Sequence, residues 1–149
     1  MSEIKGVTKH IHEGKSYLPL VDYQTWRVAL LREDETLTPW TIPFFERHNE
    51  TDEVFVLLEG SCMLIWTEEE KPALEDMRAE IMKPGVVYNV TRGTWHSSAL
   101  TEETQVLIVE NVDTNDDNSE YYYLTPAQKQ RLQDLAEQCC YPLGKEEKI

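Results

Sequence analysis

Short apolar runs separated by turn signals are the feature that most constrains the fold of this chain. Between residues 25 and 112 such runs follow one another, and Pro-Gly, Arg-Gly or a Thr-Glu-Glu cluster separates several of them. Many short strands with a turn signal about every ten residues favour a β-sandwich or a small barrel. The runs occupy residues 25–33, 38–48, 54–58, 61–66, 79–85, 86–90, 94–100 and 104–112.

Some connections between these runs can also be predicted. Glu59 and Gly60 stand between two apolar runs, which predicts a tight hairpin joining residues 54–58 to residues 61–66. The charged stretch that follows, TEEEKPALEDMR, predicts a longer hairpin loop. Two prolines within residues 38–48 indicate an edge strand or a bend, because proline cannot donate a ladder hydrogen bond.

The pattern changes near the end of the chain. Thr125 is a suitable N-cap, Pro126 suits the first helical position, and Leu132 and Leu135 form a short apolar stripe. We therefore expect a helix over about residues 125–139, packed on the outside of the barrel or on a partner subunit. The chain is expected to form one domain, 1–149, with the barrel core at about residues 22–112.

The acidic segment before this helix, residues 113–120, is predicted to be a flexible loop. Its charge suggests calcium, but its spacing does not match a calcium-binding loop and it lacks the glycine that such a loop requires.

The composition limits the partners of this protein. With 14 basic and 28 acidic residues its formal net charge is −14, which argues against a nucleic-acid partner or an anionic membrane surface. No apolar run approaches the ~20 residues of a transmembrane helix. The N-terminal residues contain no apolar signal region, and three cysteines, two of them adjacent, do not form a disulfide framework. We expect a cytoplasmic protein with a small-molecule partner.

Residues 46–60, ERHNETDEVFVLLEG, place a histidine and several carboxylates directly before an apolar run. Glu46 and His48 project from one face of a strand because they are two residues apart. A short turn could bring Glu53 beside His48, and a carboxylate that points inward at this position needs a partner. The residues between them, Asn49, Glu50 and Asp52, are interpreted as a solvated turn.

The spacing resembles the two motifs of the cupin superfamily. The first motif runs H-x-H, three or four residues, E, six residues, G, and here it reads E-R-H-(NETD)-E-(VFVLLE)-G. The second runs G, five residues, P-x-G, two residues, H, three residues, N, and here it reads G-(VVYNV)-T-R-G-(TW)-H-(SSA)-L. Glu46, Thr91 and Leu100 thus replace the usual His, Pro and Asn. The resemblance covers residues 46–100 and implies an all-β cupin double-stranded β-helix, or jelly-roll, barrel.

The resemblance also implies one metal ion inside the barrel. By position its ligands are His48, Glu53 and His96, with Glu46 at the fourth place. Two imidazoles and two carboxylates suit a divalent transition metal such as Zn, Mn, Fe or Ni. Glu46 in place of histidine lowers the net charge of the site by one, so the sequence leaves open whether the site is altered or has lost its metal.

Two segments, ERHNETDEVFVLLEG and KPGVVYNVTRGTWHSSAL, look more narrowly like the ureidoglycolate lyase family. This resemblance implies release of glyoxylate and urea from ureidoglycolate, and a homodimer. Glu46 or Glu53 would be the catalytic base where it is not a ligand.

A substrate carboxylate would need a cation. The candidates are Arg92, in the second motif, and Arg27 and Arg32, which are spaced for different faces of an earlier strand. Tyr88 is a candidate for the wall of the pocket, whereas Trp95 is expected to pack on the face opposite His96.

Two other classes of function stay open. One is a metal-dependent sugar isomerase or epimerase, and the other is a non-catalytic cupin that binds a small molecule, which the altered second motif favours slightly. His10 and His12 lie in a polar N-terminal arm and are expected to be unengaged.

Overall fold

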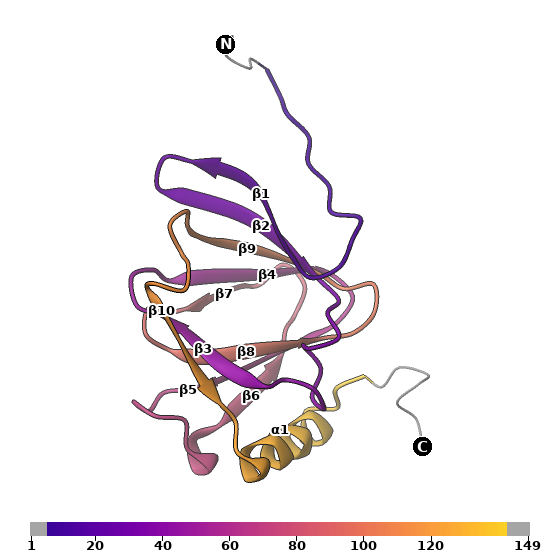
Figure 1. Cartoon of the computed structure of the whole chain (residues 1–149). Coiled ribbons are helices and arrows are strands. Elements are labelled where there is room, and N and C mark those ends of the chain that lie inside the picture. Colours follow the sequence, from indigo (N-terminus) through magenta and orange to yellow (C-terminus); the bar gives the residue numbers. More distant parts are fainter. Residues whose placement is uncertain (1–5, 143–149) are drawn as a thin grey trace.

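Two five-stranded antiparallel sheets face each other in this protein, and a helix packs outside the second sheet (Figure 1). The computed structural model describes residues 6–142. The strand order is β1-β2-β9-β4-β7 in the first sheet and β10-β3-β8-β5-β6 in the second. From β3 onward the chain repeatedly crosses between the sheets, which confirms the predicted jelly-roll barrel. The elements are β1 Tyr17–Tyr23, β2 Trp26–Arg32, β3 Phe44–His48, β4 Glu53–Glu59, β5 Cys62–Thr67, the 3-10 helix η1 Leu74–Asp76, β6 Arg78–Ile81, β7 Val87–Val90, β8 Trp95–Leu100, β9 Gln105–Asn111, β10 Ser119–Tyr123 and α1 Pro126–Gln138.

Each apolar run predicted from the sequence contains a strand, but the barrel is longer than expected. The strands extend from Tyr17 to Tyr123, beyond the predicted core of residues 22–112. The acidic segment 113–120 was predicted to be a flexible loop, yet its last two residues begin β10, which pairs with β3. The tyrosines that follow explain this difference, because aromatic residues favour a pleated, half-buried surface.

The predicted hairpin at Glu59 and Gly60 is wrong. Strand β4 pairs with β7 and β9, whereas β5 pairs with β6 and β8, so the chain passes from one sheet to the other at this turn. Gly60 has a φ of +79°, and a Cβ there would lie 2.4 Å from Oγ1 of Thr104. Glycine suits a tight arch between sheets as well as a hairpin. Nothing in the two apolar runs distinguishes one kind of connection from the other.

The charged segment after β5 is a hairpin loop, as predicted. Strands β5 and β6 pair antiparallel, and η1 lies within the loop between them.

No helix in the described residues is long and apolar enough to cross a membrane.

Side chains alternate between two cores. Inward-facing residues of both sheets form the barrel interior, which consists of Ala29, Leu31, Phe55, Leu57, Cys62, Leu64, Met82, Val90, Leu100, Val106 and Ile108. Outward-facing residues of the second sheet pack against α1; Trp95 belongs to this outer cluster, together with Leu132 and Leu135. Trp95 therefore packs on the face opposite His96, as expected.

Helix α1 begins where the sequence predicts. The Thr125 side chain accepts a hydrogen bond from the backbone N–H of Gln128, and the Gln128 side chain accepts one from the backbone N–H of Thr125. This capping box satisfies two backbone donors at the helix start.

His12 is not unengaged. Its ring is buried, its Nδ1 accepts a hydrogen bond from the backbone N–H of Gly14, and its Nε2 donates to the carbonyl oxygen of Ser16 at 2.8 Å. These two bonds define a neutral ring with the proton on Nε2, so His12 has a local structural role. His10 is exposed.

Candidate metal centre

Four side chains from both sheets converge inside the barrel. Glu46 and His48 lie on β3, His96 lies on the adjacent β8, and Glu53 opens β4 in the facing sheet. Glu46 and His96 are register partners, which puts both on the inner face. One ligand atom from each of the four residues lies within 4.8 Å of the others. The structure thus brings together the four residues that the motifs indicate as ligands.

Glu53 is the centre of this cluster. Its Oε1 lies 2.8 Å from Nε2 of His96 and 3.3 Å from Nε2 of His48. Glu46 is more distant, with its Oε1 3.7 Å from Nε2 of His48. Glu53, His48 and His96 are buried, whereas the Glu46 side chain retains 36 % of its exposure and lines the cavity described below.

The outer nitrogen of each histidine has a partner. Nδ1 of His96 donates to the carbonyl oxygen of Thr94 at 2.9 Å, which turns its Nε2 toward the cluster. Nδ1 of His48 lies 2.7 Å from the Ser119 hydroxyl of β10. Such partners fix the ring orientation of metal-binding histidines. Ser119 was missed in the sequence because nothing in the acidic segment indicates that β10 borders β3.

The four groups shift each other's pKa. Burial alone would raise the pKa of Glu53, but the adjacent imidazoles of His48 and His96 outweigh it and hold the pKa well below its usual value. Burial alone would lower the pKa of His96, yet its bond to Glu53 raises it to about 9. The same carboxylate outweighs burial at His48 and raises that pKa as well. Burial, with the Glu53 charge as a further cause, raises the pKa of Glu46.

The donor set fits a metal ion. Nε2 of His48 is buried, points at the cluster and makes no hydrogen bond of good geometry with the described residues. Ligand atoms about 2.0–2.2 Å from one ion lie at most ~4.4 Å apart. The observed limit of 4.8 Å is close to this, so a contraction of a few tenths of an ångström would close the site around a metal. The substitution at Glu46 therefore preserves a complete set of donors.

A cavity of about 580 Å³ opens beside the cluster. Its wall includes Glu46, His48, Glu53 and His96, and further along it includes Tyr17 of β1, Arg27 of β2 and Glu110 of β9. The cavity can therefore hold a small molecule in reach of all four donors.

A second polar group faces this cavity. The Tyr17 hydroxyl donates a hydrogen bond to the carboxylate of Glu110, which is buried. Burial, and then the charge of Glu53, raises the pKa of Glu110 to about 7. Arg27 is held by two hydrogen bonds to Asp22, at 2.8 and 3.0 Å.

Neither Tyr17 nor Glu110 was found from the sequence. The available signal was the position of Glu110, which shares the inward face of β9 with Val106 and Ile108, where a carboxylate is unexpected.

Of the three arginines that the sequence suggests, only Arg27 lies on the cavity wall. Arg92 is exposed in the turn before β8, where its backbone N–H donates to Asp52. Arg32 is five residues from Arg27 and so has the opposite strand parity; its Nη1 donates to the carbonyl oxygen of His12.

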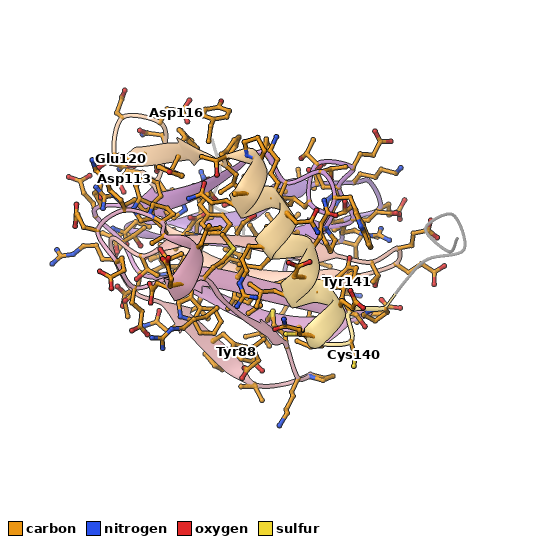
Figure 2. All side chains as sticks on the ribbon, turned by 90° about the horizontal axis from the view of Figure 1, so that it is seen from below. Tyr88, Asp113, Asp116, Glu120, Cys140 and Tyr141 are labelled. Atoms are coloured by element: carbon orange, nitrogen blue, oxygen red, sulfur yellow. The ribbon has the colours of Figure 1, made fainter. Side chains whose placement is uncertain are left out.

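Tyr88 also lies away from the cavity. It packs at the edge of the barrel interior, and its hydroxyl accepts a hydrogen bond from the backbone N–H of Lys83 at 2.9 Å. In Figure 2 Tyr88 is at the opposite side of the molecule from Asp116, which lines the cavity. The structure thus does not bring Arg92, Arg32 or Tyr88 to the cluster of candidate ligands.

Comparison with known proteins gives one match at the level of the family. A family model described as ureidoglycolate lyase matches residues 4–130. No curated protein sequence matches significantly.

Several solved structures resemble the chain. A cupin-2 domain containing protein from Shewanella frigidimarina is 18 % identical, with 68 % of this chain and 84 % of that chain covered and a TM-score of 0.47. KdgF from Halomonas sp. is 12 % identical, with 73 % and 87 % covered and a TM-score of 0.48. A cupin superfamily protein from Desulfitobacterium hafniense is 13 % identical, with 71 % and 84 % covered and a TM-score of 0.47.

Proposed function

We propose, from the premise that this chain belongs to the ureidoglycolate lyase family, that it binds a divalent transition metal and releases glyoxylate and urea from ureidoglycolate or a similar small hydroxy acid. The observation that carries the proposal is the convergence of Glu46, His48, Glu53 and His96 on the wall of a cavity large enough for such a molecule. The metal is Zn, Mn, Fe or Ni, since the donors are nitrogen and oxygen.

A bound metal of this class would polarise the hydroxyl and carboxylate oxygens of the substrate and ease loss of the hydroxyl proton. His48, His96 and Glu53 would hold it, because they are buried and fixed by further hydrogen bonds. Glu53 is a poor base, since the two histidines keep its pKa low.

We assign proton transfer to two other carboxyl groups, one from each sheet. The elimination takes a proton from the substrate hydroxyl, forms the carbonyl of glyoxylate, breaks the carbon–nitrogen bond and adds a proton to the departing urea nitrogen. Glu46 faces the cavity with a raised pKa and would accept the hydroxyl proton. Glu110, with a pKa of about 7, would give a proton to the nitrogen.

Tyr17 and Arg27 have supporting roles in the proposed reaction. Tyr17 would position Glu110 through their hydrogen bond and does not itself react. Arg27, the arginine on the cavity wall, would attract the substrate carboxylate into a cavity that is otherwise rich in carboxylates. Of the three arginines that the sequence suggests for this role, we therefore assign it to Arg27.

A metal-dependent sugar isomerase or epimerase is the second candidate. The size of the cavity favours it, because about 580 Å³ exceeds what a small hydroxy acid needs. Hydroxyl side chains on the wall, among them Thr36, Ser97 and Ser98, would suit a polyol.

Metal analysis followed by a glyoxylate-release assay tests the proposal. We expect about one metal per chain and turnover of ureidoglycolate above the rates of buffer and of the His96→Ala variant. Protein purified without stoichiometric metal, and unable to take it up, contradicts both metalloenzyme candidates. Bound metal with turnover of a sugar but not of ureidoglycolate favours the second candidate, and binding of either compound without turnover indicates a non-catalytic cupin.

Three free cysteines suit a reducing compartment, and we propose that the reaction takes place in the cytoplasm.

A further inference from the structure

The cavity beside the metal centre is rich in carboxylates and poor in cations. Apart from the four candidate ligands, its wall carries the carboxylates of Asp34, Glu110 and Asp116. Among the described lining residues Arg27 is the one arginine, and there is no lysine. Two hydrogen bonds already join the Arg27 guanidinium to Asp22. Arg27 and a bound metal can thus attract one substrate carboxylate, but this wall offers no further cation to a second anionic group.

Tyrosine hydroxyls hold two of these carboxylates in place. Tyr17 donates a hydrogen bond to Glu110, and Tyr121 donates one to Asp116. All four residues line the cavity, with Glu110 on β9 of the first sheet and Asp116 in the loop that leads to β10 of the second. A carboxylate has about four lone-pair sites, so each of the two can accept further hydrogen bonds from a ligand.

Aromatic rings lie next to one of these carboxylates. Phe44 and Tyr121 both line the cavity, and their rings make an edge contact with centroids 5.1 Å apart. Tyr121 is the register partner of Glu46, so it lies only about one strand spacing (~4.8 Å) from the metal centre. Asp116 is exposed and lies at the periphery of the molecule (Figure 2). A planar cation gains by lying over an aromatic ring, and here it would also meet a carboxylate.

The two parts of the cavity therefore suit opposite charges. At the metal centre, Nε2 of His48 is buried and makes no hydrogen bond of good geometry with the described residues, so this part takes the anionic, reacting end of a ligand. The part lined by Phe44, Tyr121 and Asp116 has acceptors and rings, and it takes a cation or a group rich in N–H donors. The formal net charge of −14 acts in the same direction, because it attracts cations.

We propose that this cavity recognises a small hydroxy acid with a guanidinium group at its far end, so that 2-guanidino-2-hydroxyacetate is a substrate beside ureidoglycolate. The inference rests on the proposed function for the reacting end of the molecule. A guanidinium group is planar like a ureido group, but it is positively charged and has N–H donors where the ureido group has a carbonyl acceptor. Its hydrogen bonds to Glu110 and Asp116 join two charged partners, which makes them stronger.

The guanidino compound can react by the same elimination. Glu46 would accept the hydroxyl proton, the carbonyl of glyoxylate forms, and the carbon–nitrogen bond breaks. The departing nitrogen takes up one proton, so the products are glyoxylate and guanidinium in place of glyoxylate and urea. The step needs no oxidant, reductant or further reactant, and one site can therefore perform both reactions.

Calorimetric titration of the purified, metal-bearing protein with guanidinoacetate and ureidoacetate tests the inference. Both compounds lack the hydroxyl group and cannot undergo the elimination, and they differ only in the group at the far end. We expect guanidinoacetate to bind at least about tenfold more tightly than ureidoacetate, because it replaces neutral donors with charged ones. Succinate, which has a second carboxylate at the far end, should bind more weakly than either.

A matched pair of variants tests the position of the guanidinium group. Asp116→Asn keeps the shape of the side chain and removes its charge, so it should lower the preference for guanidinoacetate at least about threefold. Asp117→Asn removes the same charge from the same loop, but Asp117 does not line the cavity. It should leave the preference unchanged. An equal loss in both variants assigns the preference to the overall charge of the protein and overturns the inference.

Two further outcomes of the titrations overturn the inference: ureidoacetate that binds as tightly as guanidinoacetate, and guanidinoacetate that does not bind. In a glyoxylate-release assay, turnover of 2-guanidino-2-hydroxyacetate supports the inference. Turnover of ureidoglycolate alone overturns it and leaves the proposed function in place. Turnover of neither compound contradicts the proposed function, and the binding preference then decides the recognition of the guanidinium group.

Discussion

Nε2 of His96 lies 2.8 Å from Oε1 of Glu53, although the two residues belong to strands β8 and β4 of opposite sheets. Both side chains are buried, so this pair joins the sheets inside the barrel. Removing one partner leaves an unpaired buried group, which is costly. Loss of either partner alone should therefore destabilise the metal-free protein, and a metal ion must compete with this pair for Glu53 and His96.

The stability of the metal-free protein should depend on pH in a way that this pair determines. The folded pKa of His96, about 9, is above its ordinary 6.5, so its contribution is complete below about pH 6.5 and is lost as the pH rises through 9. Glu53 has a lowered pKa, so its contribution is complete above its ordinary 4.5 and is lost at more acidic pH. The free energy of unfolding in EDTA should thus fall between pH 6.5 and 9, by on the order of 1–3 kcal/mol. Urea denaturation of Glu53→Gln should show a flatter profile, and an equal slope in both proteins contradicts the assignment.

Replacing either histidine of the cluster should remove the metal. His48→Ala and His96→Ala each delete a nitrogen donor, and we expect elemental analysis to find less than about a tenth of the wild-type metal. His12→Ala is the matched control, because the His12 ring is also buried but forms its hydrogen bonds with Gly14 and Ser16 in its own loop. Metal retained in His96→Ala, or lost equally in His12→Ala, would refute the ligand set.

Ser119 should tune the metal affinity without being a ligand. Its hydroxyl lies 2.7 Å from Nδ1 of His48, and loss of such an orienting bond typically lowers metal affinity about 10–100-fold. Ser119→Ala is therefore expected to weaken binding by about tenfold in a competition titration with a chelator. Ser98→Ala, on the same cavity wall, provides the comparison and should bind metal as the wild type does.

Glu110 should control the pH dependence of turnover. Because its pKa is about 7, a large share of Glu110 is protonated at neutral pH. This protonated share, and with it the activity, should decline as the pH rises above 7. Glu110→Gln should lower kcat by about 10²–10⁴-fold and remove this alkaline limb. Tyr17→Phe, which removes the hydrogen bond to Glu110, should move the limb and lower kcat less. A limb that is unchanged in Glu110→Gln assigns the proton to another group, and metal content measured in parallel shows that the centre is intact.

The sequence predicts the donors of this site because strand parity and motif spacing are local properties. Glu46 and His48 are two residues apart on β3, and His96 belongs to a motif whose turn occupies the residues before β8. The same local rules predict α1 from its N-cap at Thr125.

The partners of the site depend instead on which strands become neighbours. Nothing near Ser119 indicates that β10 pairs with β3, and nothing near Tyr17 indicates that β1 extends the sheet that carries Glu110. The failure at Gly60 has this same origin, because an arch between sheets and a hairpin within one sheet use the same turn residues.

Gly60 gives a direct test of that arch. A Cβ at Gly60 would lie 2.4 Å from the Thr104 side chain and 2.6 Å from the Thr104 Cα, at a φ of +79°. Gly85 has the same φ but nothing within 4 Å of a Cβ. Gly85→Ala should cost about 1–2 kcal/mol in free energy of unfolding for the left-handed backbone alone. Gly60→Ala adds a clash with backbone that cannot move freely, and we expect a total of about 2–5 kcal/mol. Urea denaturation of the two variants measures the difference, and equal losses would show that the close approach to Thr104 does not constrain the turn.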